Sequence, residues 1–170
     1  METLQTLADR QAITDRIYRY CRAVDRLDIA LGHSIWHEDA VADYGDIYRG
    51  SGRGVIDFIC EAHQLLLHHS HQVSNILIEL NGDVAGSESY VTASLRLNDQ
   101  GTIKQMTVWG RYIDEWSRRD NGWGLDKRLT IIDFDEVRDV VPMGQHEVGS
   151  RDQQDPSYKV LGKHLPGYFP

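Results

Sequence analysis

Cysteine is scarce in this sequence, and no long apolar segment is present. Cys21 and Cys60 are the two cysteines among 170 residues, too few for a disulfide framework or a cysteine-based zinc site. The longest apolar runs, such as Leu65-Leu66-Leu67, have three residues and fall far short of the roughly 20 that span a membrane. The chain begins Met1-Glu2-Thr3, without the cationic and then apolar pattern of a signal peptide. We therefore expect a soluble, cytoplasmic protein.

Positive charge is also in deficit. Lysine and arginine total 18 against 26 aspartates and glutamates, so the formal net charge is −8. Nucleic-acid phosphates and anionic membrane surfaces would repel such a chain, and we expect neither as a partner. A composition with 41% apolar and 26% charged residues is typical of globular proteins, and 170 residues suit one domain.

The first third of the chain has helical periodicity. Apolar residues recur every three or four positions over residues 4–24, which predicts an amphipathic helix. A short helix is expected from Asp28 to about Trp36. A third helix is expected over 53–67, with Ser51 as its N-cap.

Strand signals dominate the rest of the chain up to residue 136. Short strands are expected at 41–44 and 47–49, between the second and third helices. From His68 onward, alternating apolar residues and turn sequences such as Asn81-Gly82-Asp83 predict a meander of four strands. These strands are expected at 72–80, 84–97, 103–116 and 123–134, with turns that include Asp120-Asn121-Gly122.

The final segment has a different composition, because all four prolines of the chain lie within residues 137–170. We predict an α+β domain over residues 1–136, in which a cone-shaped, curved antiparallel sheet packs on three N-terminal helices. Residues 137–170 are expected to form an extended tail that covers the pocket or a neighbouring subunit. A curved sheet closed by helices leaves a cavity suited to a small molecule.

Asp25 is the first candidate for chemistry. It lies four residues after Cys21 and therefore on the apolar face of the first helix, where the apolar stripe ends. A carboxylate in that position must be paired or hydrogen-bonded if it is buried. A helix-end residue bonded to the adjacent loop, or an exposed charge, is the alternative interpretation.

His71 is the second candidate. The run His68-His69-Ser70-His71 opens the first long strand, and strand alternation places His69 and His71 on the same face. A histidine held by a carboxylate is a common general base near neutral pH. A surface cluster of histidines at the start of a strand would give the same pattern.

Two histidine pairs have the spacing of metal ligands. His69 and His71 share a strand face, and His33 and His37 would share a face of a helix. A zinc site needs further ligands that converge from elsewhere, and nothing in the sequence fixes them. We therefore expect no metal and no other cofactor.

Tyrosine and arginine supply the remaining candidates. Tyr20 and Tyr44 could donate hydrogen bonds to a substrate carbonyl or a leaving hydroxyl group. Tyr20 precedes Asp25 by five residues, roughly 140° around a helix, so the two converge only if the helix end loosens. Arg128 could point into the cavity as an anion or carbonyl clamp, or belong to a charged rim.

Several segments, taken in order, resemble the SnoaL-like branch of the NTF2-like superfamily over about residues 4–136. They are Leu7-Ala8-Asp9-Arg10-Gln11-Ala12-Ile13, Val24-Asp25-Arg26, Ser34-Ile35-Trp36-His37-Glu38-Asp39-Ala40, Gly54-x-Ile56, His71, and Tyr112-x-Asp114-Glu115-Trp116. The superfamily includes hexachlorocyclohexane dehydrochlorinase, scytalone dehydratase, bile acid 7α-dehydratase, polyketide cyclases and ketosteroid isomerases, besides non-catalytic members.

The resemblance implies an α+β cone with a deep apolar pocket, and it implies roles for individual residues. Asp25 and His71 match a catalytic pair in which the histidine removes a proton from carbon and the aspartate holds the ring. Tyr20 and Tyr44 are similar to tyrosines that act in the dehydratases. Substrate binding is assigned to four further residues: Val24, Trp36, His69 and Arg128. Ala42 stands where the dehydrochlorinase has a tryptophan, so the substrate stays open.

These observations favour a cofactor-independent lyase of the dehydratase type, acting on a bulky apolar molecule such as a steroid, terpenoid or aromatic compound. A polyketide cyclase or double-bond isomerase would use the same Asp–His pair. The alternative from another class is a non-catalytic ligand-binding or assembly module, including the small subunit of a ring-hydroxylating dioxygenase. We expect a homo-oligomer, a dimer or trimer, whose interface could use Val108, Trp109, Tyr112 or Trp116 on the sheet.

Overall fold

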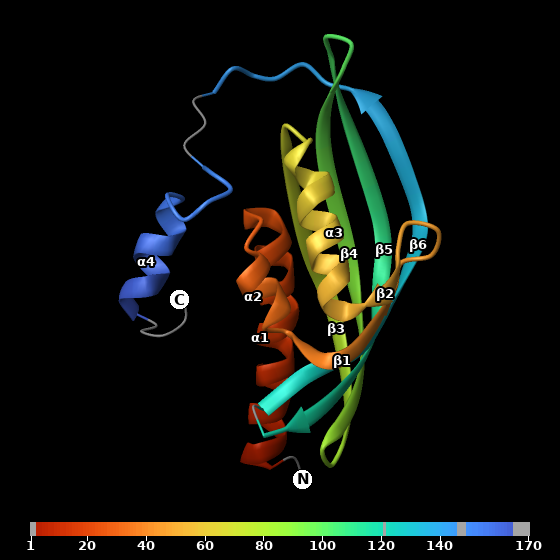
Figure 1. The fold of residues 1–170 in the computed structure, drawn as a ribbon, viewed down its shortest axis with the longest axis vertical. Coiled ribbons are helices and arrows are strands. Elements are labelled where there is room, and N and C mark those ends of the chain that lie inside the picture. The colour runs from red at the N-terminus through yellow and green to blue at the C-terminus, as the bar shows by residue number, and fades with distance from the viewer. Residues whose placement is uncertain (1–2, 121, 146–148, 165–170) are drawn as a thin grey trace.

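A computed structural model describes residues 3–120, 122–145 and 149–164 of the chain (Figure 1). Asn121 in the predicted third turn, and Pro166 and Pro170 in the tail, lie outside these residues. None of the helices in the described ranges is long and apolar enough to cross a membrane.

The helices form close to where periodicity predicts them. Helix α1 (Leu4–Arg26) is capped by the Thr3 side chain, and its C-cap residue Leu27 adopts a left-handed conformation with φ of 54°. Helix α2 (Ile29–His33) is capped by Asp28. Helix α3 (Gly52–Gln64) begins after Ser51, whose hydroxyl accepts the Gly54 amide proton as predicted.

Six strands form one curved sheet in the order β2-β1-β6-β5-β4-β3. The four long strands are β3 (His68–Asn81), β4 (Val84–Asp99), β5 (Thr102–Arg119) and β6 (Gly122–Asp139), and they pair antiparallel as the predicted meander. Strand β2 (Arg49–Ser51) pairs antiparallel with β1 (Trp36–Asp43), whereas β1 pairs parallel with β6. The α+β architecture predicted from the sequence is confirmed.

The curvature of the sheet arises from irregular strand pairing. Register shifts interrupt the pairing of β5 with β6 between Trp109 and Gly110, and again between Glu115 and Trp116. At Gly110 the two backbones approach so closely that a Cβ atom would lie 2.2 Å from the Ile131 carbonyl oxygen. Glycine permits this approach, and the bulge bends the strand around the helices.

The helices α1, α2 and α3 lie along the concave side of the sheet (Figure 1). Apolar side chains from these helices and from the sheet form one core, which includes Ile13, Ile17, Val24, Trp36 and Ile56. The packing leaves the upper part of the concave face, beside α3, less completely filled, and the candidate site lies there.

Three sequence-based expectations about local structure differ from the structure. The second helix ends at His33 and does not reach Trp36, where strand β1 begins instead. The local sequence pattern does not predict this strand, because its hydrogen bonds are made with the distant strand β6. The tail is not extended throughout, because Pro156–His164 form helix α4. The strand β6 also continues to Asp139, three residues beyond the predicted domain boundary.

Candidate active site

Asp25 and His71 are in direct contact. Asp25 lies in the last turn of α1, and His71 is the fourth residue of β3. The His71 Nδ1 atom lies 2.8 Å from Asp25 Oδ1, and the His71 backbone N–H donates to both carboxylate oxygens at 3.0 Å. One carboxylate therefore orients both the backbone and the ring of the histidine.

The pair is largely removed from solvent. The side chains of His71 and Asp25 are 9% and 14% exposed. Because a carboxylate only accepts hydrogen bonds, the proton of a neutral His71 is placed on Nδ1, and Nε2 keeps its lone pair. The arrangement thus presents an oriented imidazole whose Nε2 can accept a proton.

His71 lines an apolar cavity of about 340 Å³ between α3 and the concave face of the sheet. Asp25 is not among the residues of its wall, so His71 stands between the carboxylate and the cavity. The wall is mainly apolar, with contributions from Ile59, Leu66, Val91, Leu95, Met106, Val108 and Ile132. Such a surface suits an apolar ligand.

Four residues that carry hydroxyl groups, which we call the hydroxyl floor, line the same cavity: Tyr20, Tyr44, Tyr112 and Thr130. The Tyr20 and Tyr44 hydroxyls lie 2.7 Å apart, and the Tyr112 ring packs edge-on against Tyr20. Burial, reinforced by Tyr44, raises the pKa of Tyr20 well above its usual value. Tyr20 therefore stays neutral and can donate a hydrogen bond, either to Tyr44 or to a ligand.

Helix α1 stays regular up to Arg26, so Tyr20 and Asp25 do not converge. Tyr20 reaches Tyr44, whereas Asp25 reaches His71. Tyr20 therefore belongs to the hydroxyl floor. Asp25 acts on the cavity through its hydrogen bond to His71.

Arg128 lies behind the hydroxyl floor rather than in the cavity wall. It is fully buried, and its Nε and Nη2 atoms each lie 2.7 Å from a carboxylate oxygen of Asp114. Its guanidinium also packs 4.2 Å and 3.9 Å from the ring centroids of Tyr20 and Tyr112. Burial alone would lower the pKa of Arg128, but the Asp114 carboxylate outweighs it and raises that pKa.

Three other residues assigned to substrate binding also lie outside the cavity wall. Val24 and Trp36 are packed in the core, where Trp36 occupies the space that a Cβ on Gly52 would fill. The His69 Nε2 atom donates to the Val24 carbonyl oxygen at 2.9 Å, which ties the start of β3 to α1. As with Arg128, tertiary packing turned these side chains away from the cavity.

Three polar residues of the cavity wall were not predicted as site residues from the sequence: His63, Tyr112 and Thr130. His63 follows Ile59 and Cys60 at helical spacing, so its place on the apolar face of α3 was the available signal. Tyr112 was expected to contribute to a subunit interface with Val108 or Trp109. Tyr112 and Val108 instead face the cavity, and Trp109 stacks on Phe134 with ring centroids 4.8 Å apart.

The histidine pairs considered as metal ligands have separate partners. His33 lies 2.8 Å from Asp57, and His37 lies 3.0 Å from the Ser117 carbonyl oxygen. Within the part of the chain that the structure describes, no three histidine, cysteine, aspartate or glutamate side chains form a group that could hold a metal ion.

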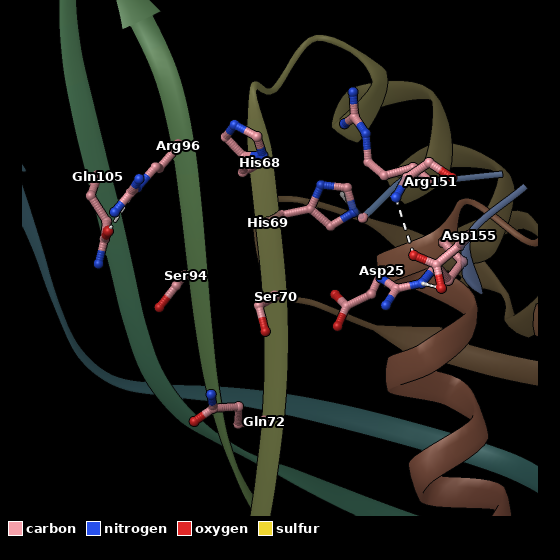
Figure 2. Close-up of a pocket in the computed structure, with 13 residues that line it drawn as sticks. Asp25, His68, His69, Ser70, Gln72, Ser94, Arg96, Gln105, Arg151 and Asp155 are labelled. Atoms are coloured by element: carbon pink, nitrogen blue, oxygen red, sulfur yellow. Dashed lines mark hydrogen bonds and ion pairs between the residues drawn. The ribbon is translucent and has the colours of Figure 1, made fainter. Parts of the chain in front are cut away.

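A second, polar hollow of about 560 Å³ lies on the other side of Asp25 (Figure 2). Strand β3 runs through its middle, with Asp25, His69 and Arg151 on one side and Ser94, Arg96 and Gln105 on the other. His71 is absent from its lining. The apolar cavity is the better candidate for a reaction site because it contains the imidazole and the hydroxyl floor.

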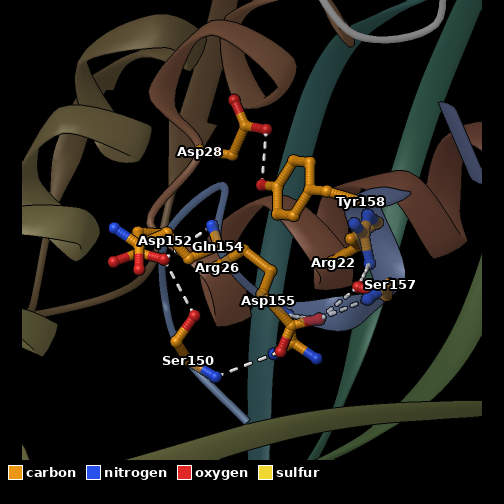
Figure 3. A network of polar contacts seen from close by, with 9 residues as sticks. All are labelled: Arg22, Arg26, Asp28, Ser150, Asp152, Gln154, Asp155, Ser157 and Tyr158. Atoms are coloured by element: carbon orange, nitrogen blue, oxygen red, sulfur yellow. Dashed lines mark hydrogen bonds and ion pairs between the residues drawn. The ribbon is translucent and has the colours of Figure 1, made fainter. Parts of the chain in front are cut away.

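Residues of the tail, among them Ser150, Arg151 and Asp155, line the polar hollow, and the tail is held against the end of α1 (Figure 3). Tyr158 donates to Asp28 at 2.9 Å, Arg22 donates to Ser157 at 3.1 Å, and Arg26 lies 3.7 Å from Asp155. These contacts place α4 beside the turn that carries Asp25.

The profile of the SnoaL-like domain family matches residues 5–128. Solved structures are similar over most of the chain. A LinA-type3 hexachlorocyclohexane dehydrochlorinase from Novosphingobium barchaimii shares 22% identity, with a TM-score of 0.69 over 85% of this chain and 97% of that one. A protein provisionally named scytalone dehydratase, from Novosphingobium aromaticivorans, shares 23% identity, with a TM-score of 0.67 over 83% and 97%.

A provisionally named aromatic ring hydroxylase from the same organism shares 27% identity, with a TM-score of 0.69 over 79% of this chain and 94% of that one. A search of curated protein sequences finds no match. Two of these structural neighbours thus carry the names of a dehydrochlorinase and, provisionally, of a dehydratase. Since the family profile covers most of the chain, this protein belongs to the SnoaL-like domain family.

Proposed function

We propose that this protein is a cofactor-independent lyase that eliminates a leaving group from a compact apolar molecule. The observation that carries the proposal is the hydrogen bond between Asp25 and His71 at the wall of an apolar cavity. An imidazole that is oriented by a carboxylate and faces a mainly apolar cavity is a suitable general base.

In the proposed reaction, His71 Nε2 takes a proton from a substrate carbon. The electrons of that C–H bond form a carbon–carbon double bond, and the leaving group departs from the neighbouring carbon with its bonding electrons. Asp25 stabilises the imidazolium that forms on His71. Tyr20 and Tyr44 share one hydroxyl–hydroxyl bond, which leaves one of their two protons for an activating or leaving oxygen.

The size of the cavity narrows the substrate. About 340 Å³ lies at the lower end of the range of small-molecule sites, which favours a compound with one or two rings over a steroid. His71 is in register with Ala93 and Val108, whereas Tyr112 lies four residues further along β5. Four residues of strand span roughly 13 Å. The side chains of His71 and Tyr112 extend into the cavity and shorten this distance, so that a compact molecule could contact both of them.

The test uses three compound types in parallel: hexachlorocyclohexane for chloride release, a cyclic β-hydroxyketone for dehydration, and a β,γ-unsaturated cyclic ketone for isomerisation. Wild type is compared with His71→Gln and Asp25→Asn, and both variants are expected to lose turnover by about 10² or more. His33→Gln and Asp57→Asn are matched controls, since that His–Asp contact is also 2.8 Å long but its side chains are 34% and 56% exposed. The control variants should keep wild-type rates.

The outcomes separate the proposed lyase from its alternatives. Turnover that survives His71→Gln would contradict the assignment of the base. Ligand binding without turnover, equal in wild type and His71→Gln, would favour a non-catalytic binding module. In D₂O, deuterium that appears in an isomerised product, with no loss of a leaving group, would indicate an isomerase.

A further inference from the structure

His63 is a second imidazole in the wall of the apolar cavity, and nothing in the proposed function so far uses it. It lies in the last turn of α3, and its ring stacks on that of His71 with centroids 5.5 Å apart and planes inclined by 23°. Two parallel imidazoles from different elements therefore border the same space.

The hydrogen bonding of the two rings differs. His71 is held by Asp25 through Nδ1. The Nδ1 atom of His63 is buried and has no hydrogen-bond partner among the described residues. A buried N–H without a partner costs more than a buried lone pair, so the proton of a neutral His63 belongs on Nε2.

The surroundings of His63 keep it uncharged. Burial, with smaller contributions from His69, His71 and Arg151, lowers the pKa of His63 to about 3. His69 is 4.5 Å away between ring centroids, and Arg151 donates to the His63 carbonyl oxygen at 2.8 Å. A neutral imidazole of this kind donates a hydrogen bond but does not give up its proton.

A purely structural role does not explain this imidazole well. A phenyl ring at position 63 would fill the same space without burying an unpaired nitrogen, which costs free energy in an apolar setting. The free-energy cost of the unpaired Nδ1 is offset if the Nε2–H group on the other edge of the ring contacts a ligand atom.

We propose that the Nε2–H group of His63 binds the departing atom of the substrate while His71 removes the proton. This deepens the proposed elimination and rests on it. In the step, the proton passes from carbon to His71 Nε2, the carbon–carbon double bond forms, and the leaving group departs with the electron pair of its bond to carbon. His63 stabilises the negative charge that develops on that atom and keeps its own proton.

A consequence concerns the leaving group. Because His63 supplies a hydrogen bond and no proton, its assistance suits an atom that departs as an anion, such as a halide. Assistance should matter more for chloride than for bromide, since chloride is the poorer leaving group and the better hydrogen-bond acceptor.

The first part of the test needs no ligand. In the full chain labelled with ¹⁵N-histidine, long-range ¹H–¹⁵N spectra between pH 5 and pH 8 report the charge and tautomer of each imidazole, and His63→Gln assigns the signal. We expect His63 to remain neutral throughout, with its proton on Nε2. A proton on Nδ1, or a positive charge at pH 5, would overturn the proposal.

The second part measures rates with a matched pair of cyclic substrates that differ in chloride or bromide as the leaving group. His63→Phe keeps the ring volume and removes the donor, and His63→Gln restores an N–H. We expect His63→Phe to lower kcat by about 10²-fold for chloride and by less for bromide, with KM little changed and partial recovery in His63→Gln.

Equal rates in wild type and His63→Phe, or equal losses for the two halides, would refute the role of His63. His71→Gln serves as the reference for the proposed function itself. If His71→Gln abolishes turnover and His63→Phe does not, the lyase proposal stands and the His63 proposal fails. If neither variant changes the rate, both fail.

Discussion

The buried ion pair between Arg128 and Asp114 allows a quantitative prediction. It shows how much one interaction contributes to the free energy of unfolding. Both side chains are 0% exposed, and two N–O distances of 2.7 Å join them. Asp114→Asn keeps the volume of the side chain and removes its charge. The guanidinium of Arg128 would then remain buried without a counter-charge behind the hydroxyl floor.

Loss of one partner of a buried pair costs about 3–5 kcal/mol, a large part of the roughly 5–15 kcal/mol by which most domains are stable. For a chain of this length, each kcal/mol lowers Tm by about 2–4 °C. Asp114→Asn is therefore expected to lower Tm by roughly 6–20 °C. The free energy of unfolding, from denaturant titration at pH 7, measures the same loss directly.

The neighbouring pair on the same strands provides the control. Lys127 lies 3.1 Å from Glu115, one residue along from the buried pair on each strand, and its side chain is 51% exposed against 66% for the glutamate. Solvent screens this pair, so Glu115→Gln should change stability by less than about 1 kcal/mol.

A double replacement, Asp114→Leu with Arg128→Met, tests the mechanism. It removes both charges together, so most of the stability lost in Asp114→Asn should return. A loss below 1 kcal/mol in Asp114→Asn, or a double variant as unstable as the single one, would refute the reasoning.

Two further predictions concern the tail and the bend of the sheet. Hydrogen bonds from Ser157 hold the pKa of Asp155 at about 2 in the folded protein, below the value of 3.8 of a free side chain. The carboxylate therefore stabilises the fold above about pH 4, and this contribution disappears as the pH falls through 2. In denaturant titrations, Asp155→Asn should be less stable than wild type at pH 7, and the two should converge near pH 2; a constant difference would contradict this. Gly110→Ala should destabilise by about 1–3 kcal/mol, because its Cβ would meet the Ile131 carbonyl oxygen at 2.2 Å. Gly86→Ala is the matched control, since its nearest neighbour would lie 4.0 Å away, and equal stabilities for the two alanine variants would exclude the steric explanation.

The order of helices and strands could be predicted from the sequence because each long element carries its own periodicity. Helix α1 and the four-strand meander have apolar residues at the spacing of their secondary structure, and Asn81-Gly82-Asp83 marks a hairpin. Asp25 and His71 could be chosen because each ends or begins an element, and a family resemblance linked them.

Local signals were misread where the same residues suit two structures. The prolines of the tail predict extended chain, but Pro156 begins helix α4, because proline is tolerated in the first turn of a helix, where its missing N–H is not needed. Asp155 accepts the Ser157 amide proton and caps that turn. The local pattern predicts a helix up to Trp36. The residue lies in a strand instead, because β1 pairs in parallel with β6, which is far away in the sequence.

Local sequence signals specify the set of elements and the chemical groups at their ends, because periodicity and turn residues act over a few positions. The identity of the cavity wall was decided by tertiary structure. Bulges in β5 and the close approach of its backbone to β6 bend the sheet, and this bend selects which side chains face the hollow. Arg128, Val24 and Trp36 were thereby packed out of the cavity wall, whereas His63 and Tyr112 were brought into it, since facing direction depends on register and packing between distant segments.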